Sequence, residues 1–158
     1  MARIIPNENT WLGFVPTVAD LAAPTGTELT GAVDLTPYLL SINASSQGNT
    51  VPTPDISTLF ETSIAGTVQA SLSADFYRDD DVDLAWTTLP RRTRGVFVIS
   101  RFGGSGTNGV PEAGDVVETW PILVVSRTNA NISNNTVMTF TVTGSVPEEP
   151  VEAAIVAT

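Results

Sequence analysis

The chain has 158 residues, of which 17 are acidic and 7 basic, and its formal net charge is −10. It contains no His, no Cys and no Lys. This composition excludes disulfides, thiolate and imidazole chemistry, and Lys nucleophiles, so carboxylates, hydroxyls and Arg are the groups left for catalysis. The negative charge disfavours binding to nucleic acid phosphates. The sequence has no run of about 18 apolar residues, so no membrane span is predicted.

The first third of the chain is predicted to combine short strands with loops. Residues 10–15 and 33–42 favour strands, and Pro37 breaks the second one. Residues 16–30 and 45–54 are rich in Gly, Pro, Ser and Thr, a composition typical of loops. Thr58 to Glu61 has the spacing of a helix capping box, but its neighbours are strand-like, so a short turn is an equal alternative.

The clearest strand covers residues 63–77, where apolar and polar side chains alternate with period two. This alternation predicts one buried face and one solvated face. Gly66 interrupts the apolar face and indicates a bulge or a close backbone approach. The predicted buried face is Ile64, Val68, Ala70, Leu72, Ala74 and Phe76, and the solvated face is Ala65, Thr67, Gln69, Ser71, Ser73 and Asp75.

One helix is predicted, over about residues 79–89. Its apolar stripe would be Val82, Ala85, Trp86 and Leu89, and the acidic residues at 79–83 suit a helix N-terminus. The acidic run also has a D-x-D-x-D spacing that opens calcium loops. The later positions of such a loop require Gly and Glu, which are absent here, so a charged helix start is the preferred interpretation.

The remaining elements are predicted to be strands joined by polar turns. Strands are expected at 96–102, 116–127 and 137–143, with Pro121 indicating an edge position or a bulge. Residues 103–109 form a Gly-rich segment without the Lys of a phosphate-binding loop, so a flexible hairpin tip is expected. Each Trp lies within an apolar pattern and is assigned to the core: Trp11, Trp86 and Trp120.

Several stretches, taken in their joint order, resemble the major tail proteins, or tail tube proteins, of long non-contractile-tailed bacteriophages, in particular those of actinobacterial hosts. The resemblance covers essentially the whole chain, and none of the stretches is a catalytic signature. They are RIIPNENTW (3–11), NASSQGNTVPTP (43–54), LFETSI (59–64), ADFYRDD (74–80), LPRRTRG (89–95), SRFGG (100–104) and SVPEEP (145–150).

The resemblance implies a mainly β protein, an antiparallel β-sandwich of the phage tail tube type with one flanking helix (about 79–89) and extended loops and termini. It implies one tail tube domain over 1–158, with an N-terminal arm (about 1–9) and a C-terminal tail (about 147–158). Such subunits form stacked, hexameric rings around the tape measure protein. The tube also meets tail terminator and distal tail proteins in the virion, and double-stranded DNA later passes through it during ejection.

This role needs no catalytic residue, metal or cofactor, and none is predicted. The small polar side chains of residues 63–77 suit the wall of a channel, so the candidate lumen-facing residues are Thr67, Gln69, Ser71, Ser73 and Asp75. Arg side chains would hold DNA, so the Arg cluster is placed at a subunit contact together with the polar loops. The candidate interface residues are Arg91, Arg92, Arg94, Gln47, Asn49, Gly103 and Gly104.

The same features leave alternatives open. Another phage structural protein, such as a tail terminator or a head decoration protein, would also be acidic and rich in β-structure. A carbohydrate-binding β-sandwich would expose aromatic residues in a cleft. A hydrolase built on paired carboxylates is the remaining alternative, although no spacing singles out a pair.

Overall fold

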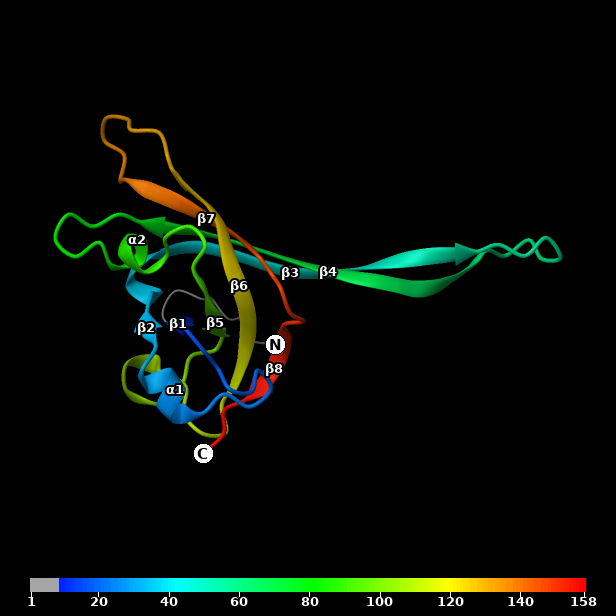
Figure 1. The fold of residues 1–158 in the computed structure, drawn as a ribbon, viewed down its shortest axis with the longest axis horizontal. Helices are drawn as coiled ribbons and strands as arrows, with labels where there is room; N and C mark the ends of the chain where they lie inside the picture. Colours follow the sequence, from blue (N-terminus) through cyan, green and yellow to red (C-terminus); the bar gives the residue numbers. More distant parts are fainter. Residues whose placement is uncertain (1–8) are drawn as a thin grey trace, which may run out of the picture.

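The computed structural model describes residues 9–158 as one antiparallel sheet with a long projecting hairpin (Figure 1). Seven of its eight strands lie in the order β2-β1-β5-β6-β7-β4-β3, and the eighth, β8, pairs with part of β6. Within the described part of the chain, no helix is both long and apolar enough to cross a bilayer. The elements are β1 (Trp11–Val15), α1 (Gly26–Thr30), β2 (Val33–Asp34), η1 (Thr36–Tyr38), β3 (Leu39–Thr53), β4 (Thr62–Tyr77), α2 (Leu84–Thr88), β5 (Arg94–Ser100), η2 (Thr107–Gly109), β6 (Val116–Asn129), β7 (Thr139–Ser145) and β8 (Val151–Ile155).

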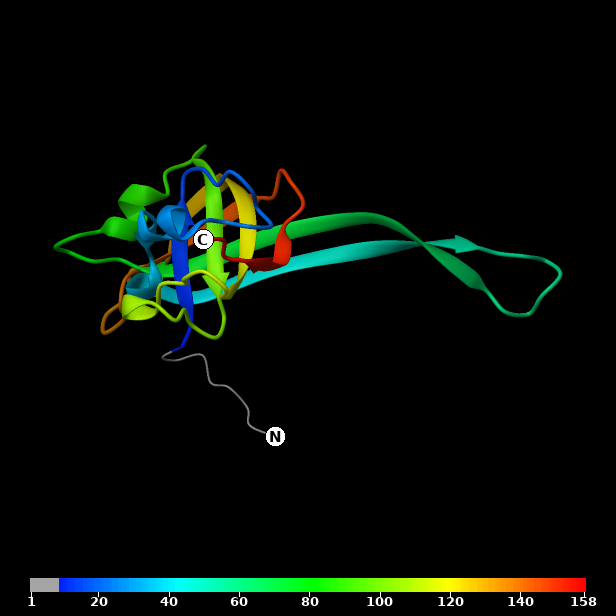
Figure 2. The ribbon, with the colours of Figure 1, turned by 90° about the horizontal axis from the view of Figure 1, so that it is seen from below.

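The sheet curls around its main core, and a second apolar cluster covers part of its other face (Figures 1 and 2). Strand β1 shows the arrangement, because Leu12 and Phe14 join the main core while Trp11 and Val15 join the second cluster. The helix α2 packs on the main core, and α1 packs on the second cluster. The prediction of mainly antiparallel β-structure is confirmed, with the sandwich formed by a single curled sheet instead of two separate ones.

The strands predicted in the second half of the chain are confirmed with shifted ends. At Pro121, β6 has β5 on one side, where Pro121 lies opposite Val96. On its other side, pairing with β8 ends at Thr119 and pairing with β7 begins at Leu123. Pro121 therefore occupies a local edge within a central strand, where a missing N–H removes no bond to a neighbour on that side.

The predicted helix over 79–89 is wrong in length, since α2 covers only Leu84–Thr88. The Asp79 carboxylate accepts the Asp81 N–H, which folds these residues into a turn ahead of the helix. Asp83 occupies the N-cap position, yet its carboxylate binds Arg78 and makes no capping hydrogen bond. The acidic side chains are thus used in local turns and an ion pair, and Val82 stays 55% exposed.

A second helix, α1, lies in the region predicted to be a loop. Thr25 and Glu28 form a reciprocal capping box, in which the Glu28 N–H donates to the Thr25 hydroxyl and the Thr25 N–H donates to the Glu28 carboxylate. The sequence therefore carries the T-x-x-E spacing of a capping box at residues 25–28, where a helix does begin. The similar spacing at Thr58 to Glu61 falls in the turn between β3 and β4 and starts no helix.

Residues 45–54 were predicted to be a loop and instead belong almost entirely to β3, which has 15 residues. The pairing with β4 decides this, because Ser45 lies opposite Ser71 and Gln47 opposite Gln69. Isolated polar residues have low strand propensity, but a long partner strand satisfies their backbone groups. The register shifts where Gly66 passes the β3 backbone, so the predicted bulge at this glycine is confirmed.

The two strands of this hairpin extend far beyond the rest of the sheet (Figures 1 and 2). Strand β7 pairs with β4 only as far as Ser71. We call residues 46–70 the distal hairpin, since β3 and β4 pair only with each other there. The face of β4 that was predicted to be buried is buried only near the body of the sheet. Leu72 is 2% exposed, whereas Val68, in the distal hairpin, is 59% exposed.

The C-terminal segment, predicted to be an extended tail, is docked onto the body. Strand β8 pairs with β6, and Ala154 and Val156 are buried in the second cluster. The last residues also bond to the segment before α1, with the Ala157 N–H donating to the Pro24 carbonyl and the Gly26 N–H donating to the Ala157 carbonyl. Residues 1–8 of the predicted N-terminal arm lie outside the described part of the chain.

Candidate functional site

The most extensive polar surface is one face of the four-stranded part of the sheet, formed by β3, β4, β7 and β6. Residues directly opposite one another in neighbouring strands share a face, so the register defines this surface. One row runs Ser41, Asp75, Thr141, Thr128, and the next runs Asn43, Ser73, Thr143, Ser126. The third runs Ser45, Ser71, Ser145 and meets the apolar Leu123 on β6, and the pair Gln47, Gln69 follows; apart from Leu123 every member is polar. We call these residues the polar face. The alternation predicted for one strand thus extends across four.

Asp75 is the only charged residue of the polar face. Its carboxylate accepts hydrogen bonds from the Ser41 hydroxyl, at 3.0 Å, and from the Thr141 hydroxyl, at 2.5 Å. These donors come from the strands on either side of β4, so the carboxylate is held over the middle of the face. Ser45 and Ser71 make a similar cross-strand contact of 3.2 Å between their hydroxyl oxygens. The result is a smooth surface of short, hydrogen-bonded side chains.

The structure divides the predicted lumen residues into two groups. Ser71, Ser73 and Asp75 lie in the four-stranded part, whereas Gln69 lies in the distal hairpin beside Gln47. Thr67 falls in the bulge and has no residue opposite it in the β3 register. Gln47 was predicted as a loop residue at a subunit contact, and the register places it on the polar face instead.

Asn49 and the two glycines predicted at contacts lie at backbone irregularities. The Asn49 carbonyl oxygen lies 3.1 Å from where a Cβ of Gly66 would stand. Gly103 has a φ of 79°. The segment that follows is held by Asp115, whose carboxylate accepts the N–H groups of Glu112 and Ser105, so it is an ordered loop and not the flexible tip that was predicted.

The predicted Arg cluster forms an exposed turn between α2 and β5. Arg91, Arg92 and Arg94, which we call the arginine turn, are all exposed. Arg92 adopts a φ of 68°, and its N–H donates to the Val124 carbonyl at 2.8 Å. Within residues 9–158 the ion pairs are Arg78–Asp83 and Arg101–Glu118, so the arginine turn has no carboxylate partner in this part of the chain.

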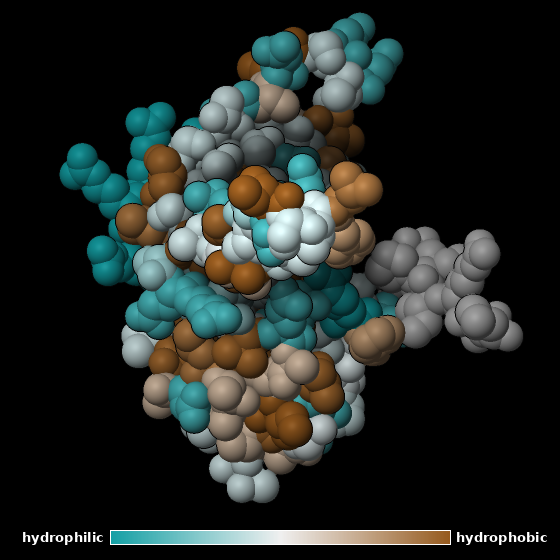
Figure 3. Space-filling model, turned by 90° about the vertical axis from the view of Figure 1, so that its right-hand side faces the viewer, coloured by the Kyte–Doolittle hydropathy of each residue, from teal (hydrophilic) through white to brown (hydrophobic). Residues whose placement is uncertain are grey.

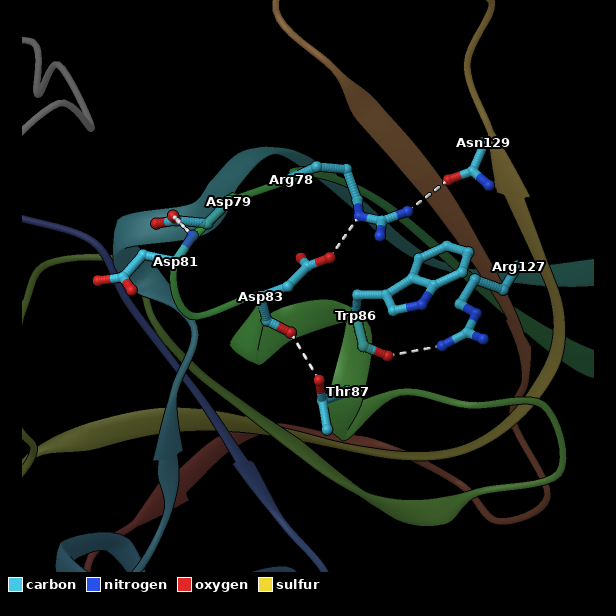
Figure 4. A network of polar contacts seen from close by, with 8 residues as sticks. All are labelled: Arg78, Asp79, Asp81, Asp83, Trp86, Thr87, Arg127 and Asn129. Carbon is cyan, nitrogen blue, oxygen red and sulfur yellow. Dashed lines mark hydrogen bonds and ion pairs between the residues drawn. The ribbon is translucent and has the colours of Figure 1, made fainter.

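Trp86 was assigned to the core, and the structure shows it half-buried between two guanidinium groups (Figure 4). The guanidinium carbons of Arg78 and Arg127 lie 3.9 and 3.5 Å from the centre of its ring. Arg78 also binds Asp83 at 2.6 Å, and Arg127 donates to the Trp86 carbonyl at 2.6 Å. Burial and the neighbouring charge of Arg78 lower the pKa of the Arg127 guanidinium. The stack fastens α2 to β6.

The tip of the distal hairpin carries exposed apolar side chains (Figure 3). Ile56, Leu59 and Phe60 are 106%, 109% and 76% exposed, and Val51 and Ile64 lie opposite each other behind them. Exposed apolar groups gathered in this way are typical of contact surfaces.

The described residues offer no catalytic arrangement. No group of three or more Asp or Glu side chains among them could hold a metal ion. The acidic run at 79–83 does not converge, since Asp79 caps a local turn and Asp83 binds Arg78. Two open hollows are present, one lined by Arg78, Asp79, Asp80 and Met138 and one between α1 and the loop before β6.

Comparison with known proteins decides the family. The sequence profile of one family, described as phage tail tube protein, matches residues 1–158. The chain belongs to this phage tail tube protein family. It is a structural protein of the virion tail and not an enzyme, which agrees with the absence of His, Cys and Lys. No match was found among curated proteins.

Solved structures share the tail tube fold. A chain from "Virion of native gene transfer agent (GTA) particle" has a TM-score of 0.57 at 12% identity, covering 96% of this chain and 99% of that one. A chain from "Tail of empty GTA particle computed with helical refinement, C6 symmetry" has a TM-score of 0.57 at 14% identity, covering 97% and 100%. A chain from the anti-feeding prophage cap, described as a tube terminating cap, has a TM-score of 0.58 at 11% identity, covering 100% and 94%.

Proposed function

We propose that this tail tube protein forms hexameric rings that stack into a hollow tube, with the polar face lining the lumen. The observation that carries this proposal is the continuous polar face over four neighbouring strands, backed by the main apolar core. The ring size is taken from the C6 symmetry of the GTA tail, whose subunit shares the fold.

The open edges of the sheet support assembly. Strand β3 is the last strand in the sheet order, so among residues 9–158 no strand pairs with its outer edge, which is 15 residues long. Exposed backbone N–H and C=O groups on such an edge pair readily with another chain. Rotation of identical copies around a ring would join β3 of one copy to a neighbour and close the polar faces into a barrel.

The distal hairpin supports contact with a further copy. An isolated two-stranded hairpin is marginally stable in water, and this one also exposes Leu59 and Phe60 at its tip. Packing against a neighbouring subunit would give this two-stranded hairpin the further contacts that it lacks in the monomer. It would also remove the apolar surface at the tip from water. Gly103 and Gly104, in the loop after β5, and Asn49, at the bulge of the distal hairpin, remain predicted contact residues for a stacked ring.

The chemistry of the polar face suits passage of the tape measure protein and of DNA. Hydroxyl and amide side chains stay hydrated and offer no cation to phosphates. Asp75 repeats around a six-membered ring as a belt of carboxylates that repels DNA within about 8 Å, the Debye length at physiological salt. Charges elsewhere on the −10 chain act over the same short distance, so the lumen residues dominate this effect.

The tube would also meet other tail components. A tail terminator and distal tail proteins would cover its two ends, and assembly would take place in the host cytoplasm. A terminator itself would stop at one ring, whereas this protein, with its open strand edge and distal hairpin, is expected to stack without a fixed limit.

Electron microscopy combined with cysteine labelling tests the proposal. The chain has no Cys, so single introduced thiols give a clean signal. In assembled tubes, a Ser73→Cys thiol on the polar face should react slowly with a bulky maleimide, because the reagent enters only through the tube ends. Ala153→Cys on the exposed side of β8 is the matched control and should react faster.

The images should show stacked rings with an open lumen, and both variants should label equally as monomers. A protein that stays monomeric with its tape measure partner would contradict the assembly. Tubes in which Ser73→Cys labels at once with the bulky reagent would contradict the orientation of the polar face.

A further inference from the structure

The arginine turn is a rigid, exposed group of positive charges. Its backbone is held on β6, because the Arg92 N–H donates to the Val124 carbonyl and the Val124 N–H donates to the Thr93 carbonyl. Arg91 and Arg94 project from this turn without a carboxylate partner among residues 9–158. In a chain of net charge −10, these three exposed arginines form a local concentration of positive charge.

Neighbouring residues increase the local positive charge. Arg78 and Arg127 stack on Trp86 close by, and Asp83 is the carboxylate that faces them. Burial lowers the pKa of Arg127 most, and the charges of Arg78 and then Arg91 lower it further. Arg91 therefore adds to an excess of positive charge, which an acidic group from outside the chain would relieve.

The same β4–β5 connection carries an opposite group of charges. Asp79, Asp80 and Asp81, which we call the acidic loop, are exposed. The Asp79 carboxylate accepts only the Asp81 N–H, and Arg78 turns away from it toward Asp83 and Asn129 (Figure 4). The acidic loop forms no ion pair with any basic group among residues 9–158.

We propose that the arginine turn of one copy docks on the acidic loop of a neighbouring copy. This proposal depends on the tube assembly proposed above. It specifies which residues hold two copies together. It is heterologous, so each copy gives its arginine turn to one neighbour and its acidic loop to another, as a ring or a stack requires. Guanidinium groups can bind carboxylates in pairs of parallel hydrogen bonds, and this attraction offsets the repulsion between acidic copies.

Charge reversal tests the contact. One variant combines Arg91→Glu with Arg94→Glu, and a second combines Asp80→Arg with Asp81→Arg; Arg92 and Asp79 stay because they shape the two turns. Like charges at an interface cost several kcal/mol, so each variant should raise the concentration needed for polymerisation by about tenfold or more. The variant carrying all four changes should polymerise near the wild-type concentration, and an equal mixture of the two double variants should form mixed tubes.

Two controls separate the contact from general effects of charge. Arg91→Lys with Arg94→Lys keeps the charge and should polymerise with a smaller defect. Glu149→Arg with Glu152→Arg changes the net charge as the acidic-loop variant does, on exposed residues elsewhere, and should polymerise as the wild type. Each monomer should melt within a few degrees of the wild type, and raising the salt concentration should weaken wild-type assembly.

The outcomes distinguish the contact from the tube. Reversal variants that polymerise as readily as the wild type, or a four-change variant that stays impaired, overturn the contact alone. The contact is also overturned if the Arg91→Glu, Arg94→Glu variant forms normal tubes but loses affinity for a DNA duplex. The arginine turn would then be a site that binds DNA. A wild-type protein that never polymerises overturns the proposed function, and the contact with it.

Discussion

The two halves of β4 have the same alternating pattern but opposite surroundings. Near the body, Leu72, Ala74 and Phe76 lie in the main core, because β7 and β3 flank them and α2 covers them. In the distal hairpin, Val68 continues this face but is 59% exposed, and the bulge at Gly66 turns Ile64, also 59% exposed, to the opposite face. Apolar periodicity therefore predicts which face of a strand is suited to burial. It does not predict whether residues of the same chain cover that face. The exposed distal half is where we propose that a neighbouring copy binds.

Val68→Asp should give the largest effect, because it tests the exposed distal half of β4 without disturbing the buried half. A charge on the exposed distal hairpin has little effect on the monomer, because surface substitutions change the free energy of unfolding by about 0.5 kcal/mol or less. It should abolish polymerisation, since an interface must then bury an unpaired carboxylate. Sedimentation and electron microscopy measure assembly. Thr67→Asp, a neighbouring exposed position within the bulge, is the control, and equal loss in both would point to general repulsion.

Leu72→Ala should give the opposite result. This side chain is 2% exposed in the main core, so its truncation should cost about 2–5 kcal/mol of unfolding free energy through lost burial and a cavity. Val68→Ala, four residues earlier on the same strand, should cost about 0.5 kcal/mol or less in the monomer. Denaturant titrations measure both. Similar losses at the two positions would mean that the distal hairpin is packed in the free subunit.

Arg78→Ala probes how the body anchors the end of β4. It removes the 2.6 Å contact to Asp83, the bond to Asn129 and one face of the Trp86 stack. The loss should be about 1–3 kcal/mol, because Asp83 then keeps a partly buried carboxylate without its partner. Arg94→Ala, exposed and without a carboxylate partner in residues 9–158, should change thermal stability little. Equal melting temperatures would show that the stack contributes nothing.

Asp75→Arg tests the polar face in the virion. The variant should lower infectivity more than particle yield, because a belt of guanidinium groups in the lumen would hold DNA. Asp75→Asn removes the charge but keeps the side-chain size, with one acceptor oxygen for one hydroxyl and an NH2 group that can donate to the other, so it separates electrostatics from packing. Infectivity per particle is the measurement. Normal ejection by Asp75→Arg would place Asp75 away from the lumen or make the charge irrelevant.

Acid should have the smallest effect, and it should differ between body and hairpin. The N–H groups of Glu112 and Ser105 lower the pKa of Asp115 below its ordinary 3.8. The carboxylate therefore stabilises the fold at pH values above 3.8, and the contribution disappears as the pH falls through the lower, folded pKa.

At neutral pH, Asp115→Asn should lose about 0.5 kcal/mol or less, because solvent screens this exposed group. The difference from the wild type should vanish below the folded pKa. The Ser57 N–H lowers the pKa of Asp55 in the same way at the hairpin tip. Asp55→Asn should not change global unfolding at any pH if the tip lies outside the cooperative unit. Unfolding titrations from pH 7 downward measure both.

The sequence predicted the elements whose signals are local. Alternation identified β4, and strong apolar runs identified β5 and β6. Trp11 and Trp120 are buried in the core as predicted. Trp86 packs against the main core but stays half-buried, because its ring also stacks between Arg78 and Arg127. The capping signal at Thr25 was readable but not recognised. The acidic run was interpreted as a helix start, although its carboxylates are bound by Arg78 and by a neighbouring N–H group.

By itself, the sequence determined the mainly β class, the absence of His, Cys and Lys chemistry, and the alternating faces of β4, because each depends on composition or on neighbours along the chain. Only the tertiary structure decided that residues 45–53 form a strand, that the C-terminal segment docks as β8, and where along β4 the core ends. These features depend on which distant strand supplies hydrogen bonds and how far it reaches. Polar residues such as Ser45 and Gln47 become a strand only when β4 satisfies their backbone groups.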